Sequence, residues 1–153
     1  MLEALLGTNK PCQIGVIVKN MDEAKARVAQ FLGMPEPNAV DAGEYSITKT
    51  VYRGQPAPEA ASKLAFFELG NIQLELIEPN EAPSTWREHL EKHGEGMHHL
   101  GYQVKDIFKS MEDMKNAGYE LTQFGYYGDG NGAYAYYDCT KELKCYIELL
   151  CSF

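Results

Sequence analysis

Two segments of the chain share one pattern of hydrophobic and polar positions. In residues 13–22 and 99–108, hydrophobic and polar side chains first alternate, as they do along a half-buried strand. Each segment then reaches an Asn or Asp, residues that favour the start of a helix. The pattern therefore predicts an internal duplication, in which both halves begin with a strand followed by a helix.

The spacing of hydrophobic positions beyond these strands predicts the remaining elements. A period of about 3.6 indicates amphipathic helices at about 22–32 and 107–117, which end at Gly33 and Gly118. Further along each half the period falls to about 2, which is typical of strands. The predicted strands are 45–53, 64–69 and 72–77 in the first half, and 119–124, 133–138 and 145–150 in the second. Each half thus has the order β-α-β-β-β.

One segment joins the halves and another lengthens the first half. Ser84 precedes a short stretch with an apolar face, which predicts a linker helix at about 84–93. Residues 54–62 contain Pro56 and Pro58 and are predicted to form a loop or lid. The expected organisation is a single domain, 1–153, made of two modules at about 11–79 and 97–151.

Composition narrows the class of protein and the class of partner. The 153 residues carry 44% hydrophobic and 24% charged side chains, which is typical of one soluble globular domain and excludes a disordered or multidomain chain. A formal charge of −8 argues against nucleic acid and anionic membranes as partners, so a small molecule is expected. No apolar run is long enough to span a membrane and no secretory leader pattern is present, so a cytoplasmic location is expected. Four cysteines occur singly, which predicts free, buried thiols.

Polar residues interrupt the predicted strands at equivalent positions of the two halves. Gln13 aligns with His99 in the repeat, and Glu75 aligns with Glu148. Alternation places His98 on the opposite face from His99. A carboxylate buried without a partner in an apolar strand is costly, so each glutamate predicts a bound cation or a shared proton. The duplication thus predicts one cation site to which both halves contribute.

Three stretches of the sequence resemble a known family. Residues 64–79 (LAFFELGNIQLELIEP), 86–94 and 96–104 (GMHHLGYQV) are similar to stretches of the vicinal oxygen chelate superfamily, which includes glyoxalases, bleomycin-resistance proteins and dioxygenases. The chain most resembles the methylmalonyl-CoA epimerase-like branch, and the resemblance covers about 11–150. It implies an α+β, glyoxalase-like fold in which two paired β-α-β-β-β modules form a cup-shaped mixed sheet.

The resemblance also implies a metal site and a chemistry. The family's metal ligands, carried over position by position, fall on Gln13, Glu75, His99 and Glu148. One divalent ion of Zn, Co, Ni or Mn is expected, since amide, imidazole and carboxylate donors suit such ions. The implied activity is that of a metal-dependent isomerase or epimerase. Glu148, or else Glu75, would take a proton next to a carbonyl of a substrate with vicinal oxygens, and the ion would stabilise the enolate.

Two alternative functions stay open. Gln13 stands where epimerases typically have His, and the set Gln, Glu, His, Glu is similar to that of some glyoxalase I enzymes. An additional catalytic carboxylate of some epimerases would fall on Leu64. A lactoylglutathione lyase is therefore the first alternative. A small-molecule-sequestering resistance protein is the alternative of another class.

Three further residues are candidates for substrate binding. Tyr126 and Tyr134 belong to an aromatic cluster around glycines at 125, 128, 130 and 132, which predict a mobile loop, so one or two of these tyrosines are expected to close over the substrate. Arg53 is a candidate because its guanidinium can bind an anionic group.

The remaining polar residues receive structural or solvent-exposed roles. His98 is expected to pack or to donate a hydrogen bond on the helix side of its strand, whereas His89 and His93 are expected to be solvated. Glu78 is expected to be exposed at a strand end. A homodimer is expected, because family members commonly pair and open strand edges favour association.

Overall fold

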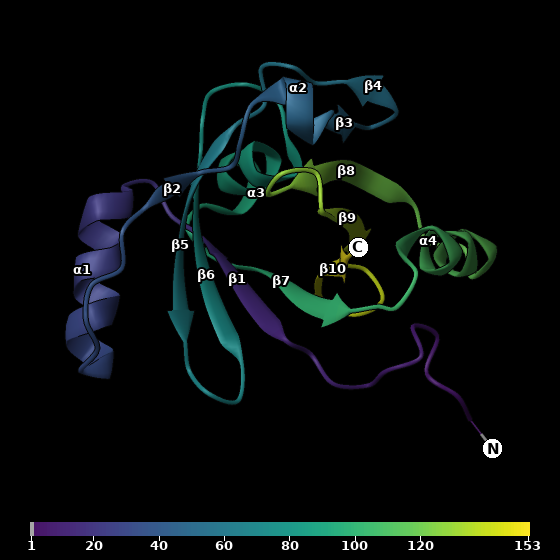
Figure 1. Cartoon of the computed structure of the whole chain (residues 1–153), viewed down its shortest axis with the longest axis horizontal. Coiled ribbons are helices and arrows are strands. Elements are labelled where there is room, and N and C mark those ends of the chain that lie inside the picture. The colour runs from purple at the N-terminus through teal and green to yellow at the C-terminus, as the bar shows by residue number, and fades with distance from the viewer. Residues whose placement is uncertain (1) are drawn as a thin grey trace.

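The computed structural model describes residues 2–153, in which ten strands form one mixed sheet (Figure 1). In chain order the elements are β1 (Gln13–Ile17), α1 (Met21–Leu32), β2 (Val40–Asp41), α2 (Tyr45–Thr48), β3 (Val51–Tyr52), β4 (Gln55–Pro56), β5 (Ser62–Glu68), β6 (Gln73–Pro79), α3 (Thr85–His93), β7 (Gly96–Gln103), α4 (Ile107–Asn116), β8 (Leu121–Tyr127), β9 (Gly132–Cys139) and β10 (Cys145–Ser152). Across the sheet the strands follow the order β2-β5-β6-β1-β7-β10-β9-β8-β3-β4.

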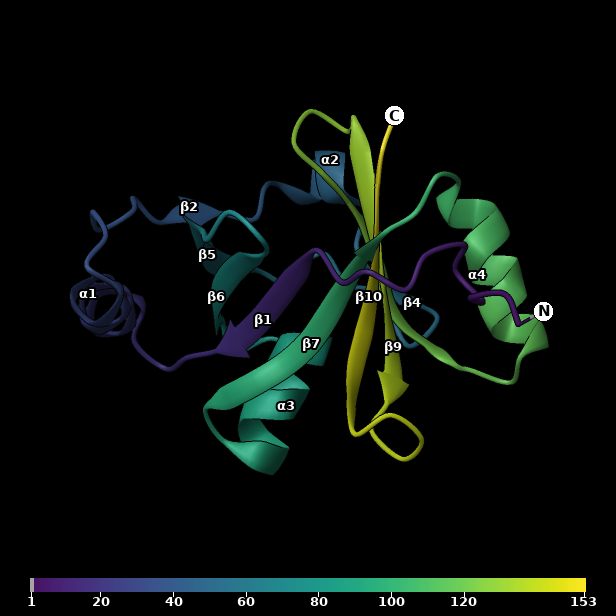
Figure 2. The ribbon, with the colours of Figure 1, turned by 90° about the horizontal axis from the view of Figure 1, so that it is seen from below.

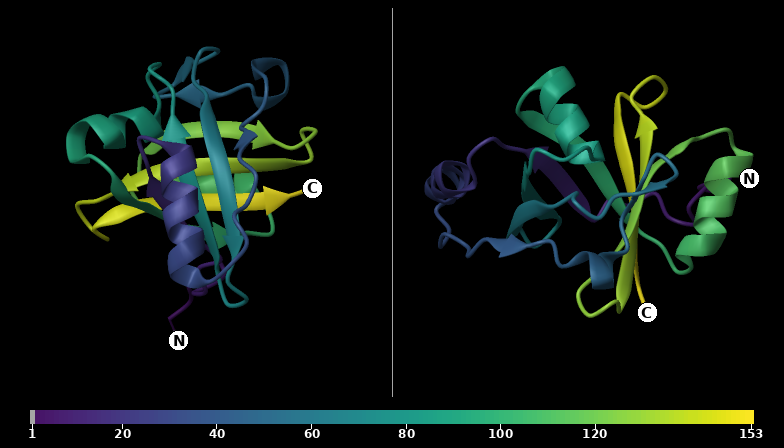
Figure 3. Two further views of the ribbon diagram at one scale, coloured as in Figure 1. Left: turned by 90° about the vertical axis from the view of Figure 1, so that its left-hand side faces the viewer. Right: turned by 90° about the horizontal axis from the view of Figure 1, so that it is seen from above.

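Strands β1 and β7 form the centre of the sheet, and the two halves of the chain extend from them in opposite directions. β1 pairs antiparallel with β7, and each pairs in parallel with the closing strand of its own half, β6 or β10. The sheet curls about this centre, with α1 outside one half and α4 outside the other (Figures 2 and 3). The predicted α+β fold with a cup-shaped mixed sheet is confirmed.

The helices begin at residues that the sequence marks. The side-chain oxygens of Asn20, Ser84 and Asp106 each accept a hydrogen bond from the backbone N–H three residues further on, at 3.0 to 3.1 Å. The three predicted helices are confirmed to within one residue at either end. Glu78, which was expected to be exposed, is half-buried instead. Its carboxylate accepts a hydrogen bond of 2.7 Å from the Met21 N–H at the start of α1, where an anion is favourable.

The strand predicted at 45–53 is wrong. These residues form the short helix α2 and the two-residue strand β3, which pairs with β8 of the other half. Lys49 and Arg53 have φ angles of 45° and 49°, left-handed conformations that interrupt an extended run. The segment therefore crosses to the far edge of the second half and adds β3 and β4 there.

Hydrophobic clusters lie on the outer faces of both halves and inside the cup. α1 packs on β5 and β6, where Met21 and Leu76 are buried. α4 packs on β9 and β10, where Ile107 and Leu149 are buried. Trp86 of α3 is buried among residues of the concave face. The helices thus cover the outside of the sheet, and α3 closes one end of the cup.

Two expectations from composition concern thiols and membranes. All four cysteines are free, as predicted, but the predicted burial holds for Cys139 and Cys151 only, since Cys12 and Cys145 are half-buried. Within residues 2–153, no helix has both the length and the apolar character needed to cross a membrane.

Candidate metal centre

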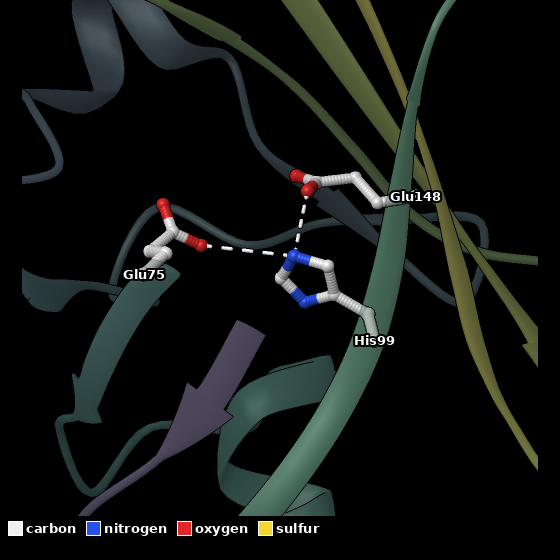
Figure 4. Close-up of side chains that lie close together, drawn as sticks. All are labelled: Glu75, His99 and Glu148. Atoms are coloured by element: carbon white, nitrogen blue, oxygen red, sulfur yellow. Dashed lines mark ion pairs between the residues drawn. The ribbon is translucent and has the colours of Figure 1, made fainter. Parts of the chain in front are cut away.

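Four polar side chains from the four central strands meet on the concave face of the sheet. They are Gln13 on β1, Glu75 on β6, His99 on β7 and Glu148 on β10, and each is buried. Figure 4 shows the two carboxylates on either side of the His99 ring. The structure therefore brings together the residues that the repeat and the resemblance had selected.

Two glycines leave the space in which these side chains meet. Gly15 lies opposite His99 on one neighbouring strand and opposite Glu75 on the other. A Cβ atom at Gly15 would fall 2.0 Å from His99 Cε1, so the imidazole ring occupies the place of a side chain. Gly101 is the equivalent residue of the other half, opposite Gln13 and next to Glu148. Alternation along the strands places both glycines on the same face as the ligands, but the sequence does not reveal that they leave space for the ligand side chains.

Three oxygen atoms surround His99 Nε2. The Gln13 Oε1 atom lies at 2.8 Å, Glu148 Oε2 at 2.9 Å and Glu75 Oε1 at 3.8 Å. A single N–H group can donate well to one of them only. The facing carboxylate atoms, Glu75 Oε1 and Glu148 Oε2, are buried and accept no hydrogen bond from the described residues. Oxygen atoms left in this way need a cation or a proton.

The carboxylates act on one another and on the tyrosines above them. Burial raises the pKa of Glu75 well above its ordinary value, and the negative charge of Glu148 raises it further. Burial and the two carboxylates likewise hold the pKa of Tyr136 well above its usual range. The pKa of Tyr134 rises to about 12 mainly through burial. Both phenols therefore stay protonated near neutral pH.

A pair of hydrogen bonds orients the Gln13 amide. Gln13 Nε2 donates to Gln73 Oε1 at 2.6 Å, and Gln73 Nε2 in turn donates to Glu68. Because Glu68 accepts only, both amide groups are held in one orientation. The Gln13 Oε1 atom is thereby directed toward His99 Nε2 and the two carboxylates.

His98 contacts the second ring nitrogen of His99, Nδ1. Its Nδ1 atom lies 3.0 Å from His99 Nδ1, and its Nε2 atom lies 3.4 Å from Thr85 Oγ1. Burial, together with the neighbouring histidines, lowers the pKa of His98 well below its usual range, so its ring is neutral. A neutral His98 whose Nε2–H faces Thr85 offers Nδ1 as an acceptor. In this arrangement His99 can donate an Nδ1–H to His98 and offer the lone pair of Nε2 to a metal ion.

The four residues suit a divalent metal ion. One ligand atom each from Glu75, His99 and Glu148 lies within 4.8 Å of the others, and the amide oxygen of Gln13 adds a fourth donor. Two carboxylates supply a charge of −2, and their unpaired oxygens face the same point. Oxygen and imidazole donors in this number are typical of sites for intermediate or hard divalent ions.

A cavity of about 490 Å³ opens above the four residues. Its walls include Phe66, Trp86, Tyr134 and Tyr136, and Gln13, Glu75 and Glu148 lie at its base. Trp86 Nε1 donates to the Tyr136 hydroxyl at 3.2 Å, which holds the two rings together. The volume and the apolar walls are typical of a site for a small molecule.

The other predicted site residues differ in their positions. Tyr134 lines the cavity as predicted, but the structure does not bring Tyr126 there. The Tyr126 ring packs against Phe124 and Phe153, since side chains alternate along β8, and the next residue, Tyr127, lines the cavity instead. Arg53 also lies outside the cavity walls.

Arg53 and His89 have partners that the sequence did not indicate. Arg53 Nη2 forms an ion pair of 2.7 Å with Glu88, so its guanidinium is already engaged. His89, expected to be solvated, is buried, and its ring centroid lies 5.1 Å from that of His98. His93 is exposed as predicted. Trp86 lies on the apolar face predicted for the linker helix. No local sequence pattern distinguishes a residue that lines a cavity from an ordinary core residue.

Comparison with known proteins identifies the family. Residues 12–137 match the model of the glyoxalase/bleomycin resistance protein/dioxygenase superfamily, and the chain belongs to this superfamily. A curated relative, the uncharacterized protein YqjC of Bacillus subtilis (strain 168), is 25% identical over 113 residues, which are 74% of this chain and 70% of the relative.

Solved structures share the fold. The methylmalonyl-CoA epimerase of Mycobacterium tuberculosis superposes with a TM-score of 0.66 and 18% identity, covering 100% of this chain and 93% of the epimerase. A hypothetical protein from Bacillus halodurans C-125 superposes with a TM-score of 0.64 and 20% identity, covering 94% of each chain. The superfamily expected from the sequence is thus confirmed, with epimerases among its structural neighbours.

Proposed function

We propose that this chain is a metal-dependent isomerase or epimerase that removes a proton next to a carbonyl group of a small molecule with vicinal oxygens, as methylmalonyl-CoA epimerases do. The observation that supports it is the buried group of Glu75, His99 and Glu148 that meets at the cavity, in which Glu75 Oε1 and Glu148 Oε2 accept no hydrogen bond from residues 2–153. The likeness of fold to the epimerases agrees with this reaction type.

The chain's own residues would divide the work. Gln13, Glu75, His99 and Glu148 would hold one divalent ion of Zn, Co, Ni or Mn. When bound, such an ion polarises a carbonyl group, makes the neighbouring C–H more acidic and offsets the charge left when the proton is removed. The aromatic walls would exclude water and hold the substrate flat above the ligands.

Glu148 is the first candidate for the base. Its carboxylate lines the cavity, so an oxygen of this group that is not bound to the ion could take a proton from a substrate carbon. Glu75 is the second candidate, because its carboxylate lines the same cavity.

The same geometry suits two other functions. A lactoylglutathione lyase would use the same ligands and move a proton between neighbouring carbons of a hemithioacetal. A protein that only sequesters a small molecule would use the cavity without the chemistry. The buried carboxylates favour the enzyme, since a binding protein has no need of two costly, unpaired acids at the base of an apolar cavity.

Metal content and proton exchange test the proposal together. Protein purified without chelator should hold close to one divalent ion per chain, and His99→Ala and Glu148→Gln should hold much less. The metal-loaded protein should exchange deuterium from solvent into one of a panel of methylmalonyl-CoA, keto sugar and hemithioacetal substrates. Equal metal content in all three proteins would refute the site, and exchange into no substrate of the panel would count against the chemistry.

A further inference from the structure

The walls of the cavity carry no positive charge. None of the residues that line it is Lys, Arg or His, although the chain contains 14 Lys and Arg residues. Its charged lining residues are all acidic: Glu75 and Glu148 at the base, and Asp41 on β2. The cavity therefore offers no side chain with which a buried anion could form an ion pair.

Cationic residues close in sequence to the lining do not supply one either. Arg87 follows the lining residue Trp86 but is absent from the walls and forms an ion pair of 2.9 Å with Glu91. Arg53 is paired with Glu88 outside the walls. Lys49 lies between two lining threonines but is itself exposed and absent from the walls. Lys63 precedes the lining residue Leu64 on β5, and alternation turns it to the other face of that strand.

Aromatic rings and amides take the place of cations. The rings of Trp86, Tyr134 and Tyr136 pack against one another, with centroids 5.4 to 6.1 Å apart. Gln73 and Gln103 add uncharged polar groups. Rings with large apolar faces favour a flat, apolar body, and the amides favour hydrogen bonds to uncharged groups.

Charge balance shows what such a cavity accepts. The −2 charge of Glu75 and Glu148 equals the charge of one divalent ion, so the loaded base is neutral and the charge of Asp41 remains. Any further anionic group on a bound molecule would lose its water without gaining a partner, which is strongly unfavourable.

We propose that the cavity selects a molecule with two neighbouring oxygens on a flat, apolar and otherwise uncharged body, and rejects one with an additional carboxylate. This inference rests on the proposed function and narrows its substrate class. It places molecules that carry a carboxylate in addition to the two chelating oxygen groups behind uncharged hydroxyketones with a flat, apolar body.

Four hydroxamic acids test this preference, because all chelate a metal ion through the same two oxygens. Benzohydroxamic acid carries a bare ring, and its 4-carbamoyl and 4-carboxy derivatives add groups of equal size without and with a charge. Acetohydroxamic acid lacks the ring. Trp86 is the chain's single tryptophan and lines the cavity, so its fluorescence reports occupancy directly, and calorimetry gives the affinities.

The expected order of affinity for the metal-loaded protein separates charge from size. The 4-carboxy compound should bind at least about tenfold more weakly than the 4-carbamoyl compound, and acetohydroxamic acid at least about tenfold more weakly than benzohydroxamic acid. Equal or tighter binding of the 4-carboxy compound would overturn the inference, as would failure of all four probes to bind the loaded protein.

A matched pair of variants tests whether the walls cause the preference. Gln103→Lys places a cation on a lining residue and should bring the affinity of the 4-carboxy compound to within about threefold of the carbamoyl compound. Glu112→Gln changes the net charge by the same amount on the exposed face of α4 and should leave the ratio unchanged. An equal effect of both variants would overturn the assignment to the walls.

Metal binding, measured first by calorimetry, separates the two proposals. A protein that binds no divalent ion contradicts the proposed function whatever the probes do. A protein that binds the ion but prefers the 4-carboxy compound keeps its proposed function and loses only the selectivity inferred from the walls.

Discussion

His99 and Gly15 show how one absent side chain makes room for a site. The imidazole ring lies where a Cβ at Gly15 would stand, and the ring is fully buried. The requirement at Gly15 is therefore steric and not conformational, since its φ angle is not positive. A glycine on the central strand is as necessary to the site as the ligand that it faces.

Replacement of Gly15 should therefore abolish the site. In Gly15→Ala the new methyl group displaces His99, and overpacking costs about 1 to 3 kcal/mol of folding free energy. Metal affinity should fall at least about tenfold, as measured by calorimetry. Gly101→Ala is the graded control, because its Cβ would lie 3.0 Å from Gln13 Cβ, and its effect should be smaller. Unchanged metal affinity in Gly15→Ala would contradict the observed position of the ring.

His98 should determine which ring nitrogen of His99 carries the proton and which is left to bind the metal ion. His98→Leu removes the acceptor for His99 Nδ1, so metal affinity should fall by about 10- to 100-fold. His98→Asn restores an oxygen acceptor near the same place and should recover part of that loss. If both variants lose equal affinity while circular dichroism shows intact folds, His98 serves for packing alone.

Among the helices and strands, the local sequence pattern predicted correctly those elements whose structure depends on neighbouring residues alone. The caps at Asn20, Ser84 and Asp106 and the alternation of the central strands predicted three helices and the faces of the four ligands. The segment 45–53 was mispredicted because its structure depends on two left-handed residues and on pairing with β8, about 70 residues away along the chain. A short stretch of sequence does not predict pairing with a strand that lies this far along the chain.

Cavity walls were predicted least well, for the same reason. Trp86 comes from the linker helix and Phe66 from a strand of the first half, whereas Tyr136 comes from a strand of the second. Periodicity shows that each is apolar and inward, but only the curvature of the sheet decides which of them borders empty space. The strand was predicted to end at residue 124, so alternation gave Tyr126 and Tyr127 no face, whereas in the structure β8 continues to Tyr127 and pairs with β9 along that length.

The four ligands lie on strands of both halves, so a bound ion should stabilise the junction between them. Removal of the ion with a chelator should lower the thermal midpoint. At an ion concentration 100 times the dissociation constant the loss is about 2.7 kcal/mol, or about 5 to 10 °C. Scanning calorimetry with and without chelator measures it, and Glu148→Gln should show a much smaller shift. An equal shift in both proteins would place the bound ion elsewhere.

At the scale of the whole molecule, the exposed apolar side chains favour self-association. Phe31 on α1 is 89% exposed, Met97 on β7 is 64% exposed and Phe108 on α4 is 55% exposed. The strand edges offer little, since the edge strands β2 and β4 have two residues each. A homodimer should therefore form through side chains. Light scattering should give twice the chain mass at micromolar concentration, and Phe31→Ser or Phe108→Ser should weaken it. A monomer throughout that range would refute the dimer.

Stability of the metal-free protein should depend on pH through Glu75. Its pKa in the folded protein lies well above 4.5, mainly through burial, so the folded state binds more protons than the unfolded state above that pH. The stability that this group contributes is present at low pH and is lost as the pH rises through the raised pKa. His98 acts in the opposite direction, but only below about 6.5, where the unfolded chain takes up a proton that the folded ring does not.

The two effects are separated by comparing wild type with Glu75→Gln in the presence of chelator. Above about pH 4.5, where the carboxyl ionises in the unfolded chain, the free energy of unfolding of the wild type should decrease with rising pH relative to that of Glu75→Gln, because the amide does not titrate. Added metal should remove the wild-type slope, since a carboxylate bound to a cation stays ionised. Urea unfolding at a series of pH values measures all three curves. A flat wild-type curve without metal would mean that the charge of Glu75 is already compensated within the protein.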